Sequence, residues 1–118
     1  MKIRQGFVSN SSSTAFMIKN TSKNTKTIVD FVKENPQLVE EFVARYDWHK
    51  YTQEDLLASA EQEMLGKRGK NMTFDPGEEK YCVFGDEDGT VIGNVFDYIL
   101  RDGGESKSFN WRFEDSLR

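Results

Sequence analysis

The chain has 118 residues, of which 36% are hydrophobic, 13% aromatic and 31% charged, so it has the length of one soluble domain with a modest, aromatic-rich core. No apolar run approaches the ~20 residues that a membrane-spanning helix needs, and the residues after Lys2 and Arg4 are too polar for a secretory signal. One Cys and one His exclude an internal disulfide framework and the usual structural zinc sites, which fits a cytoplasmic protein.

The net charge of −4 is unevenly distributed along the chain. Residues 1–26 hold five basic groups and no acid, whereas residues 75–118 hold eleven acidic groups and five basic ones. The two ends could lie close together in the fold and compensate each other. Alternatively, the acidic part could face a basic partner, or the basic part could face nucleic acid. The balance over the whole chain argues against nucleic acid as the main ligand.

The first half of the chain predicts one strand followed by helices. Residues 14–19 are short, apolar and followed by turn-forming polar residues, which is typical of a strand. A helix is expected to start at Thr25 or Thr27, and Asn35-Pro36 ends it because a residue before proline leaves the helical region. The same dipeptide can start a second helix, with Asn35 as its N-cap, and apolar residues then recur at helical spacing up to Tyr46.

A third helix is expected after Thr52, which forms a capping-box pattern with Asp55, and Gly66 ends this helix. Residues 67–71 then predict a polar loop, and residues 75–77 predict a turn. These polar segments separate the helical part of the chain from the strand that follows.

The second half predicts a strand, a helix and a further strand. Residues 80–84 are apolar at both parities, so we expect a strand that is buried on both faces and central in its sheet. A fourth helix is expected over residues 91–101, which carry one broad apolar stripe. Phe109, Trp111 and Phe113 alternate with polar residues, which is typical of a strand with one exposed face.

This order of elements predicts an α+β fold with a small antiparallel or mixed sheet of three to four strands and about four helices packed mainly on one face. We expect a single domain over residues 1–118, with residues 1–14 as a basic, Ser-rich segment in which residues 3–8 could add a short edge strand. Because the strands and the fourth helix each show one strong apolar face, we expect a shared core containing Phe16, Phe84, Phe96, Trp111 and Phe113.

The amino-terminal residues follow a distinctive order, Arg4-Gln5-Gly6-Phe7-Val8-Ser9-Asn10-Ser11-Ser12-Ser13-Thr14-Ala15-Phe16. This order resembles the Arg-x-Gly-Phe-Val-Ser-Asn-Ser-Ser-Ser-x-x-Phe amino terminus of a group of small phage and bacterial proteins, over about the first eighteen residues. The resemblance carries no established activity. It implies a bacteriophage-type accessory protein, a setting in which small acidic proteins often bind and redirect host proteins.

The candidate recognition or modification residues lie in this segment: Arg4, Ser9, Asn10, Ser11, Ser12 and Ser13. Three interpretations of the run from Ser9 to Thr14 remain open. Its hydroxyls and amides could bind an anion, its serines could be modified, or its small side chains could satisfy their own backbone in a turn. The glycines and lysine of a phosphate-binding loop are missing. Composition favours the turn, whereas the shared order favours recognition.

The other candidate binding site is an acidic turn made up of Asp86, Glu87 and Asp88. Counting back from Gly89 does not give the ligand positions of an EF-hand loop, so we expect no metal site there. His49 has no evident nucleophile beside it, and Cys82 is expected to behave as a small apolar residue in a buried strand. Neither residue therefore predicts catalysis.

The sequence predicts no catalytic residue, cofactor or metal. We expect a non-enzymatic protein that binds a host or phage protein, not nucleic acid or a membrane, and that is located in the host cytoplasm or on the virion. One alternative is a virion or assembly component that docks through its Ser-rich amino terminus. Another is a small enzyme, or a substrate of serine modification, centred on Ser9 to Ser13.

Overall fold

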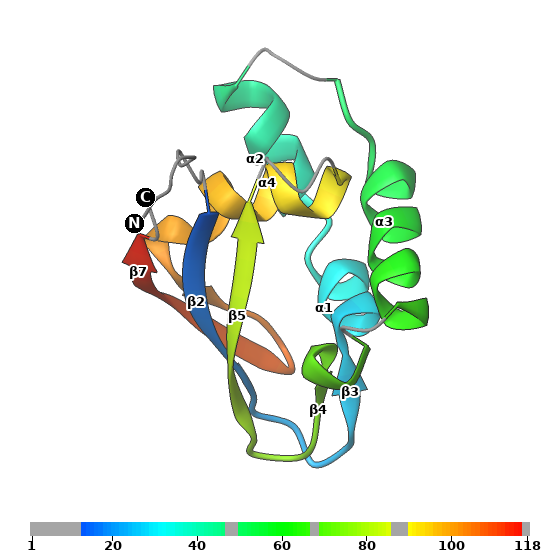
Figure 1. Cartoon of the computed structure of the whole chain (residues 1–118), viewed down its shortest axis with the longest axis vertical. Coiled ribbons are helices and arrows are strands. Elements are labelled where there is room, and N and C mark those ends of the chain that lie inside the picture. Colours follow the sequence, from blue (N-terminus) through cyan, green and yellow to red (C-terminus); the bar gives the residue numbers. More distant parts are fainter. Residues whose placement is uncertain (1–12, 47–49, 67–68, 86–89, 117–118) are drawn as a thin grey trace, which may run out of the picture.

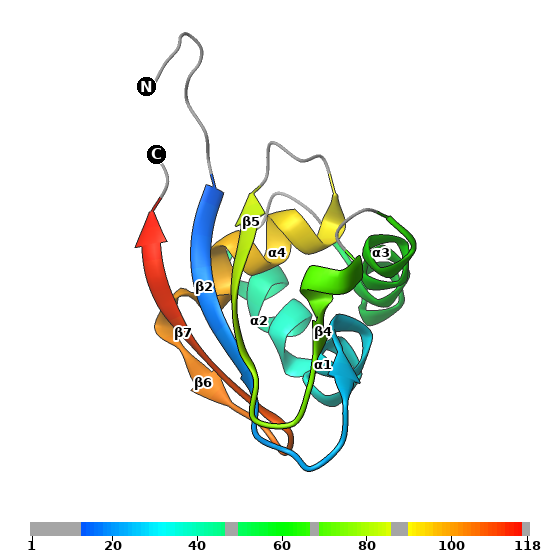
Figure 2. The ribbon, with the colours of Figure 1, turned by 60° about the horizontal axis from the view of Figure 1, so that its bottom comes forward.

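A four-stranded antiparallel sheet in the order β5-β2-β7-β6 forms one layer of the molecule, and a separate two-stranded ribbon pairs β3 with β4. The computed structural model describes residues 13–46, 50–66, 69–85 and 90–116. Its four described α-helices pack on the sheet and form the second layer (Figures 1 and 2). The predicted α+β fold is therefore confirmed. No helix in the described ranges is long and apolar enough to cross a membrane.

The bounds of the elements agree closely with the predicted strands and helices. In chain order they are β2 (Ser13–Asn20), β3 (Lys26–Thr27), α1 (Ile28–Glu34), α2 (Gln37–Arg45), α3 (Gln53–Leu65), the 3₁₀ helix η1 (Gly69–Met72), β4 (Thr73–Phe74), β5 (Glu79–Gly85), α4 (Val91–Ile99), the 3₁₀ helix η3 (Leu100–Asp102), β6 (Gly104–Glu105) and β7 (Phe109–Ser116). The elements that the sequence did not predict (β3, η1, β4 and β6) are only two to four residues long. Such lengths are too short for a periodic pattern to develop.

Side-chain capping sets where two of the helices begin. The backbone N–H of Thr52 donates to Asp55 Oδ2 (2.9 Å), and the N–H of Asp55 donates to Thr52 Oγ1 (3.2 Å), which confirms the predicted capping box. Thr27 and Asp30 form the same arrangement at the start of α1. These bonds satisfy backbone donors that a helix leaves unpaired at its first turn.

The prediction that Asn35 caps the second helix is wrong by one residue. The N-cap of α2 is Pro36, whereas Asn35 is the C-cap of α1. The Asn35 amide donates to the carbonyl oxygen of Phe31 (2.9 Å), and its Oδ1 accepts from Gln37 (3.0 Å). Asn35 therefore ends the first helix, because its side-chain amide donates a hydrogen bond to a backbone carbonyl group of that helix.

The central strand is β2, and the prediction that residues 80–84 form the centre of the sheet is wrong. β2 pairs with β5 along one edge and with β7 along the other, so β5 lies at the edge of the sheet. On β5 the side chains of Cys82 and Phe84 are buried, but Val83 is half-buried and Tyr81 is 52% exposed. A strand with apolar or aromatic residues on both faces can still have one face exposed, because an amphipathic tyrosine is stable in contact with water.

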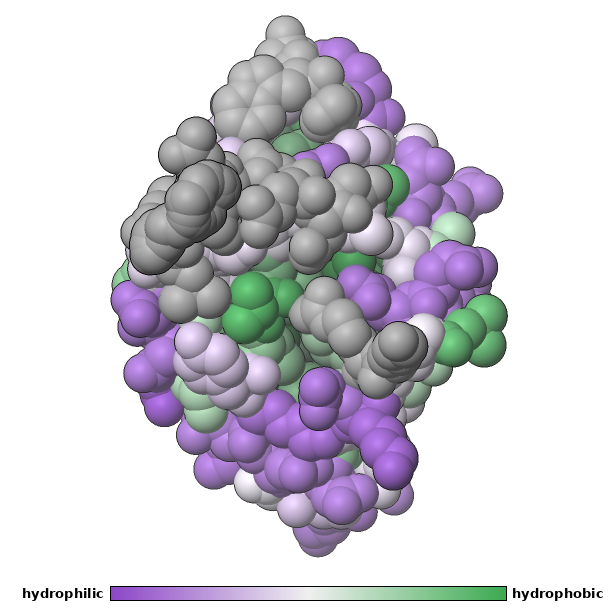
Figure 3. Space-filling view, in the orientation of Figure 1, coloured by the Kyte–Doolittle hydropathy of each residue, from purple (hydrophilic) through white to green (hydrophobic). Residues whose placement is uncertain are grey.

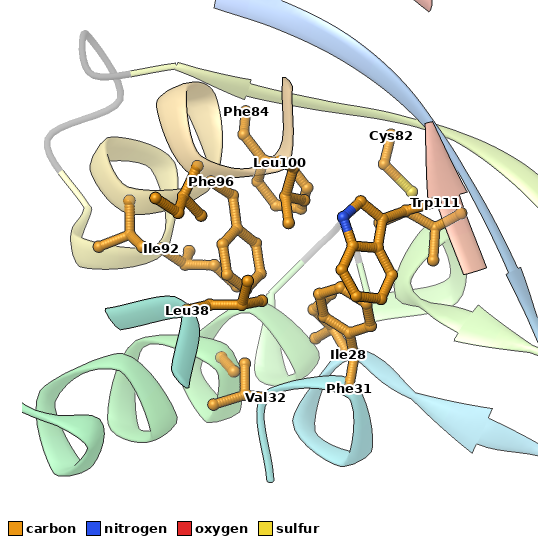
Figure 4. Close-up of a cluster of buried hydrophobic side chains, with 14 of the residues drawn as sticks. Ile28, Phe31, Val32, Leu38, Cys82, Phe84, Ile92, Phe96, Leu100 and Trp111 are labelled. Atoms are coloured by element: carbon orange, nitrogen blue, oxygen red, sulfur yellow. The ribbon is translucent and has the colours of Figure 1, made fainter. Parts of the chain in front are cut away.

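One hydrophobic core lies between the inner face of the sheet and the helices (Figure 4). Four of the five aromatic residues predicted to share it do so: Phe16, Phe84, Phe96 and Trp111. Phe113 is the exception, because it is 44% exposed and meets only the edge of the Phe16 ring, at a centroid distance of 6.5 Å. The apolar alternation of β7 therefore extends to a side chain that the core covers only in part.

A β-bulge interrupts the pairing of β2 with β7 just beyond Phe113. Phe16 is opposite Phe113 but Ala15 is opposite Asp115, so Glu114 is an extra residue on β7. Such an insertion bends a strand and increases its twist.

The unequal charges of the two ends of the chain come together in the sheet. β2 belongs to the basic first part of the chain, and it lies between β5 and β7 of the acidic last part. Among the described residues, the basic side chains Lys19, Lys23 and Lys26 form no ion pair. The two ends therefore lie side by side in the sheet, but these lysines form no ion pair with the acidic part in the described structure.

Truncating Trp111 to Ala should lower the free energy of unfolding by about 3–5 kcal/mol, the range expected for deleting a large buried aromatic side chain. The Trp111 ring is 6% exposed and packs edge-on against Phe31 at 5.0 Å. Its indole nitrogen is buried without a hydrogen-bond partner. Trp111→Phe should therefore cost much less than Trp111→Ala, because it also removes an unsatisfied donor. Urea denaturation followed by circular dichroism measures both changes.

Phe113→Ala is the matched control, since Phe113 lies on the same strand two residues away but is 44% exposed. Its truncation should cost about 1 kcal/mol. Equal losses for Trp111→Ala and Phe113→Ala would contradict the assignment of the core.

Candidate functional site

Two features of the described structure can carry function. One is a polar cluster at the amino end of β2, where the Ser-rich segment joins the sheet. The other is a pocket between α2 and the start of α3.

The polar cluster joins the first residues of β2 to α4. Thr14 Oγ1 donates to Asp97 Oδ1 (2.5 Å), and Arg101 Nη2 lies 3.1 Å from both Thr14 Oγ1 and Asp97 Oδ1. Arg101 Nε also donates to the carbonyl oxygen of Asp97 (2.7 Å), and its guanidinium lies over the Tyr98 ring, 5.1 Å from the centroid. Thr14 and Asp97 are fully buried, whereas the Arg101 side chain is 34% exposed.

Burial decides what this cluster can do. A nucleophilic hydroxyl must reach its substrate, and the Thr14 hydroxyl is enclosed and already bonded to a carboxylate. A buried carboxylate is stable only when it is paired and hydrogen-bonded, and Arg101 and Thr14 supply both requirements. The cluster therefore fixes the amino end of the central strand to α4.

Of the candidate recognition residues, only Ser13 belongs to the described part of the chain. Ser13 belongs to β2, is 7% exposed and lies opposite Gly85. A Cβ atom at Gly85 would collide with the Ser13 hydroxyl, so the two strands pack closely here. The other members of the segment, Arg4, Ser9, Asn10, Ser11 and Ser12, lie outside the described residues, as do residues 3–8 of the expected edge strand. Their roles stay predictions.

The remaining sequence candidates are placed as follows. The acidic turn of Asp86, Glu87 and Asp88 and the residue His49 lie outside the described residues. Cys82 is a buried thiol, with its Sγ 3.7 Å from the carbonyl oxygen of Lys80. In the described part of the chain, no three His, Cys, Asp or Glu side chains come close enough together to hold a metal ion.

The pocket opens between the outer side of α2 and the start of α3 and has a volume of about 350 Å³. Its lining is mainly apolar and consists of Val39, Glu40, Val43, Ala44, Tyr51, Thr52 and Gln53. Sites for small ligands begin near this size, so the pocket fits one long side chain or a molecule of similar size.

Hydrogen bonds and ring contacts with the core hold the lining residues of the pocket in place. The Tyr51 ring stacks on Phe42 at 6.0 Å, and its hydroxyl accepts a hydrogen bond from Asn94 of α4 (2.8 Å). Gln53 donates through Nε2 to the carbonyl oxygen of Val32 (2.9 Å), while its Oε1 is buried without a hydrogen-bond partner. The pocket is therefore backed by well-packed residues of α1, α2 and α4.

The two helices beside the pocket are acidic. Together α2 and α3 hold six acidic residues and one basic residue, Arg45. Arg45 donates to Asp102 (3.2 Å), and this hydrogen bond and the negative charge of Asp102 raise the pKa of the Arg45 guanidinium above its usual value. The one cation of these helices is thus engaged outside the pocket.

Sequence reasoning missed both features. For the cluster there was a signal, because Asp97 lies in a strongly apolar helix and Arg101 follows it by four residues, in the 3₁₀ turn that continues this helix. For the pocket there was none, because its two walls come from helices whose relative placement depends on the packing of the whole core.

Comparison with protein-family models, with curated proteins and with solved structures gave no match for this chain.

Thr14→Val should lower the free energy of unfolding by about 1.5–3 kcal/mol, because it removes the hydroxyl that donates to a buried carboxylate while keeping the shape of the side chain. Thr14→Ser retains the hydroxyl and serves as the control, with a smaller loss expected. Chemical denaturation of the two variants measures the difference. If Thr14→Val were as stable as the parent chain, the hydrogen bond to Asp97 would contribute nothing to the anchor.

Proposed function

We propose that this chain is a non-enzymatic protein-binding module, and that it binds a positively charged protein surface through α2 and α3. The resemblance of the amino terminus to phage proteins supports a host or phage protein as the partner. The observation that carries the proposal is the acidic, outward-facing surface of these two helices.

The charge of α3 is one-sided. Its thirteen residues include four acids, Glu54, Asp55, Glu61 and Glu63, and no basic residue. Glu54 and Glu61 are exposed and form no hydrogen bond or ion pair with the described residues. Unpaired charges of one sign attract a partner of the opposite sign and orient it during encounter.

The same surface includes an exposed apolar group. Leu65, the last residue of α3, is 81% exposed. In Figure 3, which has the orientation of Figure 1, hydrophilic residues cover most of the α3 side of the molecule. An apolar residue bordered by charged ones is the composition of many protein interfaces, in which a polar rim surrounds apolar contacts.

A second candidate function is a virion or assembly component that docks through its amino-terminal segment. The anchor of Thr14 to Asp97 and Arg101 favours it, because a segment that precedes Ser13 leaves the sheet from a fixed point. In that case the segment, and not the acidic helices, would carry the affinity.

Panning a displayed random-peptide library against the immobilised chain tests the acidic surface. We expect peptides that contain Lys or Arg to be enriched. Their affinity should fall about tenfold when four acids of the surface are neutralised in the variant E40Q/E41Q/E54Q/E61Q, since several charge pairs are lost together.

The matched control removes the same number of charges from exposed positions around the sheet, in the variant E79Q/E105Q/E114Q/D115N. It should bind like the parent chain. Peptides that bind the first variant as well as the parent would refute the acidic surface as the binding site.

A chain that begins at Ser13 separates the two candidate functions. Because Ser13–Asn20 forms the central strand, the deletion must stop at residue 12, and the shortened chain should unfold within a few degrees of the full chain. If the acidic helices carry binding, the selected peptides should bind it unchanged. If the segment carries binding, their affinity should be lost while the melting temperature is kept.

A further inference from the structure

We propose that the pocket between α2 and α3 binds the side chain of a lysine or arginine residue of the partner protein. The inference rests on the proposed function, and it names the group that the acidic surface recognises. It follows from the shape, the charge and the aromatic wall of the pocket.

The shape of the pocket fits a long, unbranched side chain. Val39, Val43 and Ala44 present apolar surface from α2, and Tyr51 presents an aromatic ring. The stems of lysine and arginine are apolar and pack along such surfaces while the charged head remains near water. A volume of about 350 Å³ leaves room for the head group as well as the stem.

The charge of the pocket requires a cationic head group. Glu40 belongs to the lining, is exposed, and forms no hydrogen bond or ion pair with the described residues. Arg45, the basic residue of α2, is engaged by Asp102 instead. An anionic occupant would therefore meet an uncompensated carboxylate, whereas a cation would neutralise it.

The aromatic wall of the pocket also favours a cation. Tyr51 belongs to the lining, and an aromatic ring attracts a cation at its π face. Ammonium and guanidinium groups suit such a wall, whereas a carboxylate group would be repelled by it. Gln53 Oε1 is enclosed and therefore adds no contact with an occupant.

The experiment titrates the full chain with n-pentylguanidine, which carries the head group of arginine on an alkyl stem two carbons longer, and follows backbone amide signals by NMR. The matched probe n-pentylurea has nearly the same shape but no charge. We expect n-pentylguanidine to shift the amides of residues 39–44 and 51–53 with a dissociation constant in the millimolar range, and n-pentylurea to bind at least threefold more weakly.

Two pairs of variants locate the site. Glu40→Gln should weaken n-pentylguanidine about threefold, the size of one exposed charge pair, whereas Glu105→Gln, at an exposed position of β6 outside the acidic surface, should not. Ala44→Trp fills the pocket from an exposed position and should abolish binding, whereas Ala58→Trp, an exposed position of α3 outside the pocket, should not. Melting temperatures confirm that all four variants fold.

Several outcomes would overturn the inference. Equal binding of the charged and uncharged probes would make the pocket a general apolar site. Shifts confined to other residues, or binding that survives Ala44→Trp, would place the cation elsewhere. Tighter binding to the chain that begins at Ser13 would show that Lys2 or Arg4 of the same molecule competes for the pocket. If basic peptides bind the acidic surface but n-pentylguanidine fails, only the pocket is refuted and the proposed function stands.

Discussion

Phe31 is the side chain on which the two layers depend. It lies on α1, and its ring meets Phe96 of α4 at 5.5 Å, Phe109 of β7 at 5.2 Å and Trp111 of β7 at 5.0 Å, each time edge to face. Such contacts combine apolar burial with the favourable geometry of aromatic quadrupoles. Because one ring joins a helix of the first half of the chain to a helix and a strand of the second half, the positions of α1, α4 and β7 are coupled. The placement of α2, which follows α1 after two residues, depends on the same packing.

Strong local patterns in the sequence were sufficient to predict most of the helices and strands. The capping box at Thr52 and the alternation from Phe109 both predict their elements correctly, because each depends on neighbours within a few residues. The errors concern the places where another part of the chain decides the outcome. Whether Tyr81 is buried depends on which strand takes the centre of the sheet, and whether Phe113 is buried depends on which distant side chains pack over that part of β7. Periodicity gives the direction of a side chain but not what covers it.

The candidate site was less predictable than the fold for the same reason. The pocket combines Val43 and Ala44, which look like ordinary helix residues, with Thr52, which looks like an ordinary N-cap. Its acidic surroundings are visible in the composition of α3, but charge alone does not predict a cavity. The serine run was the most distinctive pattern in the sequence, and the structure shows that Ser13, its last serine, is part of the central strand. The distinctive sequence order therefore extends into the central strand.

The bulge at Glu114 has a consequence for how the sheet ends. Beyond β6, which pairs only with Asn110 and Trp111, the outer edge of β7 has no sheet partner among the described strands. Regular, flat edges of this kind recruit strands from other molecules and start aggregation. Here the extra residue breaks the regular spacing of the backbone groups, and Arg112, Glu114 and Asp115 place charges along it. A strand arriving from another copy at this edge would meet a twisted, hydrated strand, which disfavours pairing there.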